Sequence, residues 1–304
     1  MDPAFRQRII DVHGDAGRDW LVRLPLLVAH LTAHWQLVLG EPFKLSYSFV
    51  AAARRRDGTN VVLKIGVPGP DLDRERHALV DFEGRGMVRL IDSDCGDGAL
   101  LLERLSPGTS LSTVENEEAE LTAAADVLEL LTRPMVVDDP AQYPTTQDWA
   151  LELSAMKQEF GGGTGPFPAD LVERAERLFL ELHADREPVS LLHGDLHQDN
   201  ILAAERRPWL GIDPKGILGE RAYEAGSLLR NPLRRVLSSR DPRALVLKRA
   251  SFLADRLGLD RQRLVAYGVA QLVLAAWWAF EDHDEAWEPL LAVAESVAPL
   301  ARRM

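Results

Sequence analysis

Apolar residues in the first hundred positions form one helix-like stretch and several short, strand-like runs. An apolar face that repeats at helical spacing predicts a helix over residues 19–35. Apolar runs over 43–53 and 60–65 favour strands, and Asp57-Gly58 between them is typical of a tight hairpin turn. The next elements expected are a charged helix and two strands, over 71–82, 87–92 and 99–103.

Helical patterns dominate beyond residue 115, and several further helices are expected from Glu224 to the C-terminal end. A glycine run over 161–165 is flanked by prolines and lacks the Gly-Lys-Ser/Thr of a phosphate loop, which predicts a flexible loop between helices. The sequence therefore predicts an α+β fold of two lobes that meet near the loop at Pro107-Gly108. A small β-rich lobe with an N-terminal helix is expected over 1–104 and a larger, mainly helical lobe over 105–304. The first three helices of the larger lobe are expected over 115–131, 146–159 and 169–184.

The composition is that of an acidic globular protein: the 304 residues carry a formal net charge of −12, and 46% of them are hydrophobic. The single cysteine, Cys95, excludes an intrachain disulfide and a cysteine-based metal site. The N-terminus shows no signal peptide, and the longest apolar run, 269–280, is too short to span a bilayer, so we expect a cytoplasmic protein without membrane contact. The charge argues against nucleic-acid binding. It suits a cationic substrate, and equally a protein that is acidic only for solubility.

The most informative polar groups lie in one short segment of the second lobe. Asp195 is followed by Asn200 five residues later and by Asp213 after a further strand-like run. Phosphoryl transfer uses such a set, because one carboxylate orients and deprotonates an incoming hydroxyl while an amide oxygen and a second carboxylate hold Mg²⁺. Apolar pairs at 191–192 and 201–202 bracket the segment like a small buried hairpin, which disfavours the alternative of an ordinary polar turn.

Histidines accompany this segment and a similar one near the N-terminus. We interpret His193 and His197 as structural residues that hydrogen-bond the loop, and zinc is disfavoured because no further ligand cluster lies nearby. A second His-Gly-Asp, at residues 13–15, has no asparagine at the required offset. It is interpreted as a loop and a helix cap.

A lysine at the end of an apolar strand, Lys64, is similar to the strand lysine of kinases, which implies a contact to nucleotide phosphates, with Glu75 of the following helix as its partner. Asp73 and Glu83 stay open as partners, since a sequence does not define helix phase that finely. The alternative for Lys64 is an edge-strand lysine in solvent. The other candidate nucleotide contacts also follow from this similarity to kinases. Ser46 and Ser48 lie where a loop would cover the phosphates, and residues 100–105 look like the hinge, in which the backbones of Glu103 and Leu105 would pair with adenine.

Two replacements set the segment apart from that of protein kinases: His-Gly-Asp-Leu-His stands at 193–197 in place of His-Arg-Asp, and Asp-Pro stands at 213–214 in place of Asp-Phe-Gly. The chain thereby resembles the aminoglycoside phosphotransferase family. Residues 88–92, 101–105 and 189–232 are similar to its streptomycin 6-kinase and hydroxyurea-resistance branch. The resemblance implies a two-lobed, protein-kinase-like fold, with ATP and Mg²⁺ as cofactors. It also implies transfer of the γ-phosphate to a small molecule such as streptomycin, at the 6-hydroxyl, and hence antibiotic resistance.

Streptomycin carries two guanidinium groups, so the resemblance also implies carboxylates in the acceptor pocket. The candidate acids are Glu220, Glu224, Glu281, Asp282 and Asp284. Trp277 or Trp278 could stack on a guanidinium or sugar face. The alternative is that the tryptophans belong to a helix core and the acids to the surface.

Two other functions stay open at the level of sequence. One is the same chemistry on a sugar or another metabolite, because the residues of the reacting segment do not distinguish small alcohols. The other is a pseudokinase that binds nucleotide without transfer. The presence of all four expected polar groups argues against the pseudokinase: Lys64, Asp195, Asn200 and Asp213.

Overall fold

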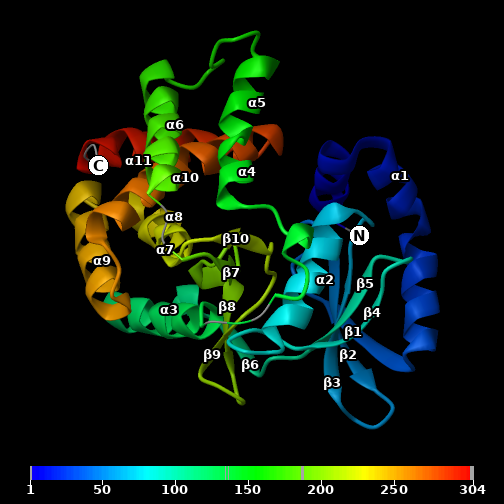
Figure 1. Ribbon diagram of the computed structural model, residues 1–304. Coiled ribbons are helices and arrows are strands. Elements are labelled where there is room, and N and C mark those ends of the chain that lie inside the picture. The colour runs from blue at the N-terminus through cyan, green and yellow to red at the C-terminus, as the bar shows by residue number, and fades with distance from the viewer. Residues whose placement is uncertain (1, 134, 136, 186–187, 302–304) are drawn as a thin grey trace. The chain divides into compact units, whose positions relative to one another are not determined.

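The computed structural model describes residues 2–133, 135, 137–185 and 188–301. The chain divides into two compact units, Met1–Gly108 and Thr109–Met304 (Figure 1). The division falls within a short strand, β6 (Pro107–Ser110), and the sequence prediction gave the boundary near Arg104 to Gly108. Each unit has its own secondary structure: the first is built on a sheet and the second mainly on helices.

A five-stranded antiparallel sheet lies at the centre of the first unit, in the order β1-β2-β3-β5-β4. The expected hairpin turn at Asp57-Gly58 joins β2 to β3. Val61, Leu63 and Ile65 of β3 alternate along the strand and are fully buried, as period-two alternation requires. The strands are β1 (Leu37–Pro42), β2 (Phe49–Arg55), β3 (Asn60–Ile65), β4 (Leu90–Asp94) and β5 (Ala99–Glu103).

The first strand and the loop after it differ from the sequence prediction. β1 was not expected, and the strand predicted to begin at Phe43 begins only at Phe49. Leu37 is the one buried residue of β1, because β1 lies at the edge of the sheet, so its sequence shows no clear alternation. Phe43 and Tyr47 are 45% and 38% exposed, so the apolar residues that suggested a strand belong to a solvent-facing loop.

A long helix, α1 (Pro3–His34), shares the apolar core of this sheet (Figure 1). Phe5, Trp20 and Leu24 of α1 are buried in the same cluster as Leu63. Gly14 has φ of 56° and ψ of −129°, which bends the helix at the point where a loop was expected. The helix predicted from residue 19 is therefore the second half of α1, and the half before the bend was not predicted.

The second helix of this unit, α2 (Pro70–Phe82), lies where a charged helix was expected. Its buried residues are Glu75, Ala78, Leu79 and Phe82. Three of them are apolar and recur at helical spacing, so packing of this face carries the carboxylate of Glu75 into the interior.

Helices make up most of the second unit. The predicted helices over 115–131 and 169–184 are confirmed as α3 and α6, whereas the one over 146–159 is divided at Leu151 into α4 and α5. The glycine run lies between α5 and α6 and is not helical, as predicted. The helices are α3 (Glu117–Leu131), α4 (Thr146–Ala150), α5 (Glu152–Glu159), α6 (Ala169–Ala184), α7 (Arg221–Arg230), α8 (Leu233–Leu237), α9 (Pro242–Leu257), α10 (Arg261–Glu281) and α11 (Trp287–Val297).

The central helix of this unit is α10, which packs against α6, α7 and α11. Of its 21 residues, 14 are buried. By length and hydropathy α10 could cross a membrane, but 72% of its apolar window is buried within the protein, as in the core helix of a globular fold. Glycines bring α7 close to α10, because a Cβ atom at Gly226 would lie 3.2 Å from the backbone nitrogen of Gly268.

Two small antiparallel pairs carry the segment that contains Asp195. β7 (Ser190–Leu192) pairs with β10 (Ile217–Gly219), and β8 (Ile201–Ala204) pairs with β9 (Trp209–Gly211). The expected hairpin between the apolar pairs on either side of this segment is therefore wrong. Residues 191–192 belong to β7, which pairs with β10, and residues 201–202 belong to β8, which lies between β6 and β9 in a different sheet.

Candidate active site

Two histidines hold the loop that follows β7 by the same local hydrogen bond. Nδ1 of His193 accepts the backbone N–H of Asp195 at 3.2 Å, and Nδ1 of His197 accepts that of Asp199 at 3.2 Å. Nε2 of His193 lies 2.7 Å from the carbonyl oxygen of Ile212, to which the neutral ring donates. Burial lowers the pKa of His193 to about 4, so this ring is neutral at pH 7 and ties the loop to the end of β9.

Asp195 is half-buried in this loop and is held from one side by Asn200. Nδ2 of Asn200 donates to the carbonyl oxygen of Asp195 at 3.0 Å and lies 3.4 Å from its Oδ2. Burial raises the pKa of Asp195, but the charge and hydrogen bond of His197 and the charge of Lys215 outweigh burial and hold the pKa below its usual range. The carboxylate is therefore ionised at neutral pH.

The second aspartate of the segment, Asp213, follows β9 in the left-handed backbone conformation, with φ of 58°. The N–H of Ile212 donates to the carbonyl oxygen of Asn200 at 2.9 Å, which places the two candidate metal ligands on adjacent segments. The N–H of Lys215 donates to the carbonyl oxygen of His193 at 2.7 Å. One carboxylate and one amide oxygen are hard ligands of the kind that Mg²⁺ binds, with water or phosphate oxygens in its other positions.

The carboxylate of Glu224 is buried beneath the loop and accepts the N–H groups on both sides of Asp195. Its Oε2 lies 3.0 Å from the nitrogen of Gly194, and its Oε1 lies 3.3 Å from that of Leu196. Burial raises the pKa of Glu224 to about 7, although these backbone hydrogen bonds oppose the rise. The sequence placed Glu224 in the acceptor pocket, and the structure corrects this, because the residue is 1% exposed and shapes the loop from inside.

Glu220 was also expected in the acceptor pocket, and the structure places it elsewhere. Its two carboxylate oxygens accept from Nε and Nη2 of Arg263 at 2.9 and 2.7 Å. The same guanidinium donates to the carbonyl oxygen of Leu182 at 2.8 Å. Since Glu220 is 3% exposed, this ion pair fastens the beginning of α7 to α10 and the end of α6.

In the first unit, Lys64 of β3 pairs with Glu75 of α2. Its Nζ lies 2.6 and 2.7 Å from the two oxygens of that carboxylate, and both residues are buried. Of the two alternative partners, Asp73 is exposed, and Glu83 follows the end of α2 in a left-handed conformation. The edge-strand alternative for Lys64 does not hold, because β3 lies between β2 and β5.

The remaining candidates for nucleotide contact also lie in the first unit. Ser46 is exposed and Ser48 half-buried in the loop between β1 and β2. Glu103 ends β5, and its backbone N–H donates to the carbonyl oxygen of Arg89 at 2.9 Å. Leu105 is buried just after this strand.

The tryptophan pair of α10 divides between core and partly exposed surface. Trp277 is 1% exposed and makes edge-to-face contacts with Phe160 and Phe167, so the structure corrects its placement in the acceptor pocket. Trp278 is half-buried and meets Trp149 edge-on, with ring centroids 5.1 Å apart. Of the two rings, the accessible one is Trp278.

Four carboxylates gather where α10 ends. Glu281 is the last residue of α10 and Asp282 caps it, while Glu152 and Glu159 come from α5. Burial, together with the negative charges of Glu152, Glu159 and Asp282, raises the pKa of Glu281 to about 7. A cation bound here would relieve the repulsion that raises this pKa. The two acids of α5 were not predicted, because only the packing of α5 on α10 brings them to this place.

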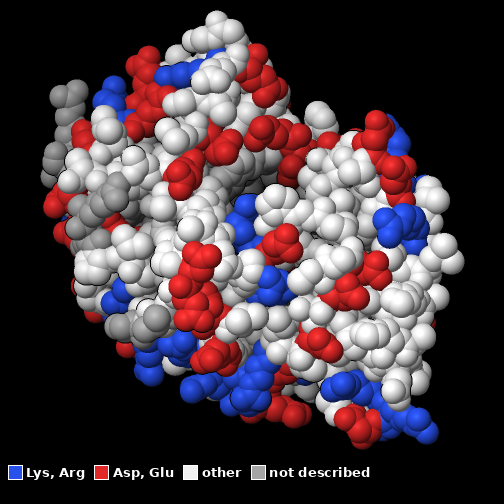
Figure 2. All heavy atoms as spheres, turned by 45° about the vertical axis from the view of Figure 1, so that its right-hand side comes forward, with Lys and Arg blue, Asp and Glu red and all other residues white. Residues whose placement is uncertain are grey.

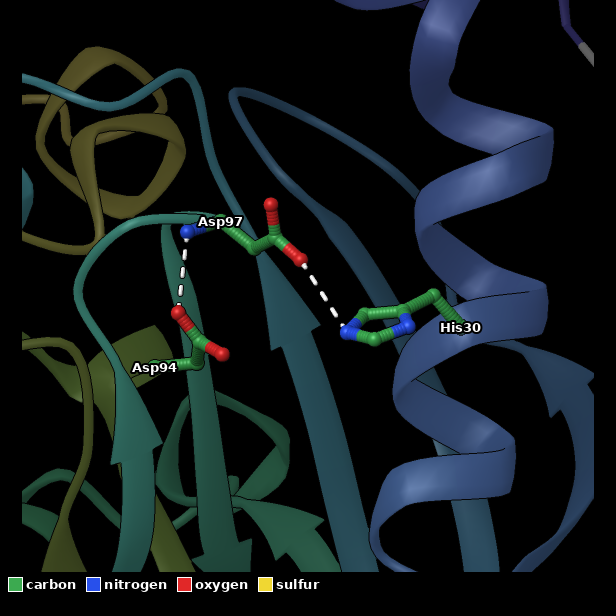
Figure 3. Close-up of side chains that lie close together, drawn as sticks. All are labelled: His30, Asp94 and Asp97. Carbon is green, nitrogen blue, oxygen red and sulfur yellow. Dashed lines mark hydrogen bonds and ion pairs between the residues drawn. The ribbon is translucent and has the colours of Figure 1, made fainter.

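A further group of possible metal ligands lies in the first unit, formed by His30 of α1 with Asp94 and Asp97 of the β4–β5 hairpin (Figure 3). Nε2 of His30 lies 3.7 Å from Oδ2 of Asp97, whose N–H donates to Asp94 at 3.0 Å. The side chain of His30 is 62% exposed. Close by, the indole N–H of Trp35 donates to Asp92 at 3.0 Å. We interpret the group as a polar contact between α1 and the hairpin.

The charge of the surface is mainly negative and unevenly spread. Figure 2 shows Asp and Glu side chains in separate groups over one face of the molecule, while Lys and Arg side chains gather mainly along its lower edge.

Comparison with known sequences gives strong similarity over most of the chain. Residues 34–283 match the family described as aminoglycoside/hydroxyurea antibiotic resistance kinase. A streptomycin 6-kinase from Streptomyces glaucescens is 33% identical, and the match covers 91% of this chain and 89% of the relative. A hydroxyurea phosphotransferase from Kitasatospora aureofaciens is 36% identical, with 93% and 81% covered.

Comparison with solved structures gives the same fold at low sequence identity. A thermostable mutant of an aminoglycoside phosphotransferase, in ternary complex with ADP and hygromycin B, superposes with a TM-score of 0.59. The match covers 88% of this chain and 97% of the other at 16% identity. The fold is thus kinase-like, with a small sheet unit and a larger helical unit. Together with the sequence matches, this shows that the chain belongs to the aminoglycoside/hydroxyurea antibiotic resistance kinase family.

Proposed function

We propose that this kinase transfers the γ-phosphate of ATP, in the presence of Mg²⁺, to a hydroxyl of a small cationic acceptor, and that this acceptor is streptomycin at its 6-hydroxyl. The observation that carries the proposal is the loop around Asp195, which Glu224, His193 and Asn200 hold from three sides. The name of the relative from Streptomyces glaucescens supports streptomycin as the acceptor. An enzyme that consumes ATP would act in the cytoplasm.

Asp195 is proposed to orient the acceptor hydroxyl and to take its proton. Its lowered pKa makes it a weak base. A weak base suffices, because the transition state of phosphoryl transfer is loose, and the attacking oxygen needs position more than deprotonation.

Asn200 and Asp213 are proposed to hold Mg²⁺ through the amide oxygen and the carboxylate. The hydrogen bond from Asn200 Nδ2 to the carbonyl oxygen of Asp195 supports this, because it directs the opposite end of the planar amide away from the loop. Bound there, Mg²⁺ would neutralise charge on the nucleotide phosphates.

The first unit is proposed to bind the nucleotide. Lys64, oriented by Glu75, would contact phosphate oxygens. The adenine would pair with the backbone at Glu103 and Leu105. The loop with Ser46 and Ser48 would offer hydroxyl and N–H groups to the phosphates. The ADP bound to the related phosphotransferase supports an adenine nucleotide here.

The acids at the end of α10 are proposed to bind the cationic groups of the acceptor. Glu281 and Asp282 were candidates from the sequence, and Glu152 and Glu159 of α5 extend the group. The partly exposed ring of Trp278 lies on the same helix, where it could stack on a guanidinium plane.

The second candidate acceptor is hydroxyurea, which the relative named hydroxyurea phosphotransferase favours. Hydroxyurea is small and uncharged, so it would not need the acidic group. Transfer to a sugar or another metabolite is the further alternative. Asp195 would contact only the acceptor hydroxyl and Asn200 only the metal, so neither residue distinguishes one small alcohol from another.

The test is an ADP-release assay with ATP and Mg²⁺ against streptomycin, other aminoglycosides, hydroxyurea and common sugars. We expect turnover with streptomycin, and phosphorus NMR of the product should locate the phosphate on the 6-hydroxyl. Turnover with hydroxyurea or a sugar alone would exclude streptomycin and keep the kinase. Absence of ADP release with every acceptor, despite ATP binding, would instead support the pseudokinase.

A further inference from the structure

We propose that His197 is a positioning residue for Asp195: its Nε2–H is directed at one carboxylate oxygen, Oδ2, so that the other, Oδ1, accepts the acceptor hydroxyl. The inference rests on the proposed function, in which Asp195 receives that hydroxyl. His197 is the second histidine of the His-Gly-Asp-Leu-His segment. From the sequence it was expected only to hydrogen-bond the loop.

The imidazole ring of His197 has its proton on Nε2. His197 precedes a short 3-10 helix, η3 (Gln198–Asn200), and its Nδ1 accepts the N–H of Asp199 at 3.2 Å. A ring nitrogen that accepts a hydrogen bond carries no proton, so the proton of the neutral ring lies on Nε2. If the ring takes up a second proton, Nε2 still carries its own. Nε2 is therefore a donor in both protonation states.

The Nε2 donor of His197 faces the carboxylate of Asp195. Nε2 of His197 lies 3.7 Å from Oδ2 of Asp195, and the two side chains are 24% and 35% exposed. This separation is that of an ion pair rather than a hydrogen bond, and such contacts in free enzymes often shorten when substrate binds. His197 thus contacts the carboxylate of Asp195 from a partly exposed position.

The two carboxylate oxygens of Asp195 differ in the side chains that lie near them. Nδ2 of Asn200 lies 3.4 Å from the same Oδ2 and 3.0 Å from the carbonyl oxygen of Asp195. The donors of His197 and Asn200 therefore both lie near Oδ2. Within the part of the chain that the structure describes, no protein donor reaches Oδ1. A carboxylate fixed in this way presents Oδ1 in one orientation, as positioning catalysis requires.

His193 accepts the same hydrogen bond at Nδ1, from the backbone N–H two residues on, yet it does not position Asp195 through Nε2. It makes the same contact through Nδ1, but its Nε2 donates to the carbonyl oxygen of Ile212 and the ring is fully buried. The two histidines of the segment are therefore alike in their backbone bond and differ in what Nε2 meets.

Substitutions can separate the two bonds of His197. In His197→Asn, the amide oxygen can replace Nδ1 as the acceptor for Asp199, while the side chain is too short to reach Asp195. In His197→Gln, the longer amide can bring an N–H towards Oδ2. In His197→Ala, both bonds are lost. All three should fold, because His197 is only partly buried.

We expect kcat to fall by about 10- to 100-fold in His197→Asn, with the KM values for ATP and acceptor within about twofold of wild type. The melting temperature of His197→Asn should stay close to that of wild type, and His197→Gln should recover part of the lost kcat. A wild-type kcat in His197→Asn would overturn the proposal and leave His197 with the local bond alone. Equal losses of kcat in the Asn and Gln variants would also overturn it.

The tautomer of the ring gives a measurement that needs no turnover. In protein labelled with ¹⁵N at histidine, the neutral ring of His197 should show its proton on Nε2, and the Nε2 signal should shift in Asp195→Asn. A proton on Nδ1, or an Nε2 signal that does not respond to Asp195→Asn, would refute the inference even if wild type turned over streptomycin. Loss of all turnover in wild type would refute the proposed function and leave this measurement valid.

Discussion

At the residue scale, the three polar groups of the segment were predictable because each is defined by short spacing in the chain. What the structure adds is the set of groups that holds them. The residues on either side of Asp195 donate their backbone N–H groups to Glu224, and the Asp195 side chain contacts Asn200 and His197. Glu224 carries no sequence signal of this role, since its oxygens meet N–H groups 28 and 30 residues away.

Replacement of Asp195 tests its proposed role as the carboxylate that receives the acceptor hydroxyl. Asp195→Asn should lower kcat by about 10³-fold or more, because the amide can neither take the proton nor orient the hydroxyl in the same way. Nucleotide affinity, measured by titration calorimetry, should stay within about threefold. Asp15→Asn is the matched control, since it alters the other His-Gly-Asp at an exposed position. Retention of a tenth of wild-type kcat by Asp195→Asn would contradict the assignment.

Replacement of Glu224 tests the buried carboxylate through the pH dependence of stability. Its pKa is about 7 in the folded protein, against an ordinary value of 4.5, so the folded protein holds a proton that the unfolded chain releases between these pH values. This stabilisation is complete below about pH 4.5 and is lost as the pH rises through about 7. The melting temperature of wild type relative to Glu224→Gln should therefore fall between pH 5 and pH 8. A constant difference would show that Glu224 does not titrate in this window.

At the element scale, α10 determines the positions of the residues around the loop. It packs closely against α7 at Gly226 and Gly268, and α7 carries Glu224. The buried ion pair between Glu220 and Arg263 fastens the beginning of α7 to the same helix. Accurate placement of the loop thus depends on a helix that contributes none of the proposed reacting groups.

Removal of one partner of this ion pair should be costly. Arg263→Ala should lower the free energy of unfolding by about 3–5 kcal/mol, because it leaves the carboxylate of Glu220 buried without its guanidinium. Arg256→Ala is the control, since Arg256 pairs with Asp126 at the surface, where the side chains are 39% and 53% exposed. That control should change the free energy by less than about 1 kcal/mol. Urea denaturation measures both, and equal effects would contradict a structural role for the buried pair.

At the scale of the whole molecule, the net charge of −12 is consistent both with a cationic substrate and with simple solubility. The acids near Glu281 favour the first explanation, because burial together with the negative charges of Glu152, Glu159 and Asp282 raises the pKa of Glu281 to about 7, and a bound cation would offset those charges. The candidate groups are divided between the two units: Lys64 and Glu75 belong to the first, and the segment from Asp195 to Asp213 belongs to the second.

The charge of Glu281 should make acceptor binding depend on pH. Protonation below about pH 7 removes its negative charge, so the KM for streptomycin should rise several-fold between about pH 8 and pH 6. Glu281→Gln should raise this KM at pH 8 and flatten the dependence, while the KM for ATP stays unchanged. Added salt should raise the KM for streptomycin by screening, but not that for uncharged hydroxyurea. An identical response of both acceptors would place cation binding elsewhere.

The sequence by itself determined the features that depend on near neighbours. The spacing of Asp195, Asn200 and Asp213 was readable because the loop that carries these candidate residues is a local structure, and the turn at Asp57-Gly58 was readable because two residues define it. Most helices were readable from their apolar periodicity. A loop and a helix cap were expected at residues 13–15, whereas the structure has a bend at Gly14 within one long helix.

Only the tertiary structure decided which carboxylates are free to meet a ligand. In the sequence Glu220, Glu224 and Glu281 are alike, since each is an acid near an apolar helix. Packing of α7 on α10 buries the first two against Arg263 and the loop N–H groups, and it leaves Glu281 at an exposed helix end. The physical reason is that burial and pairing depend on partners 28 to 43 positions away in the chain, whose contact no local pattern encodes.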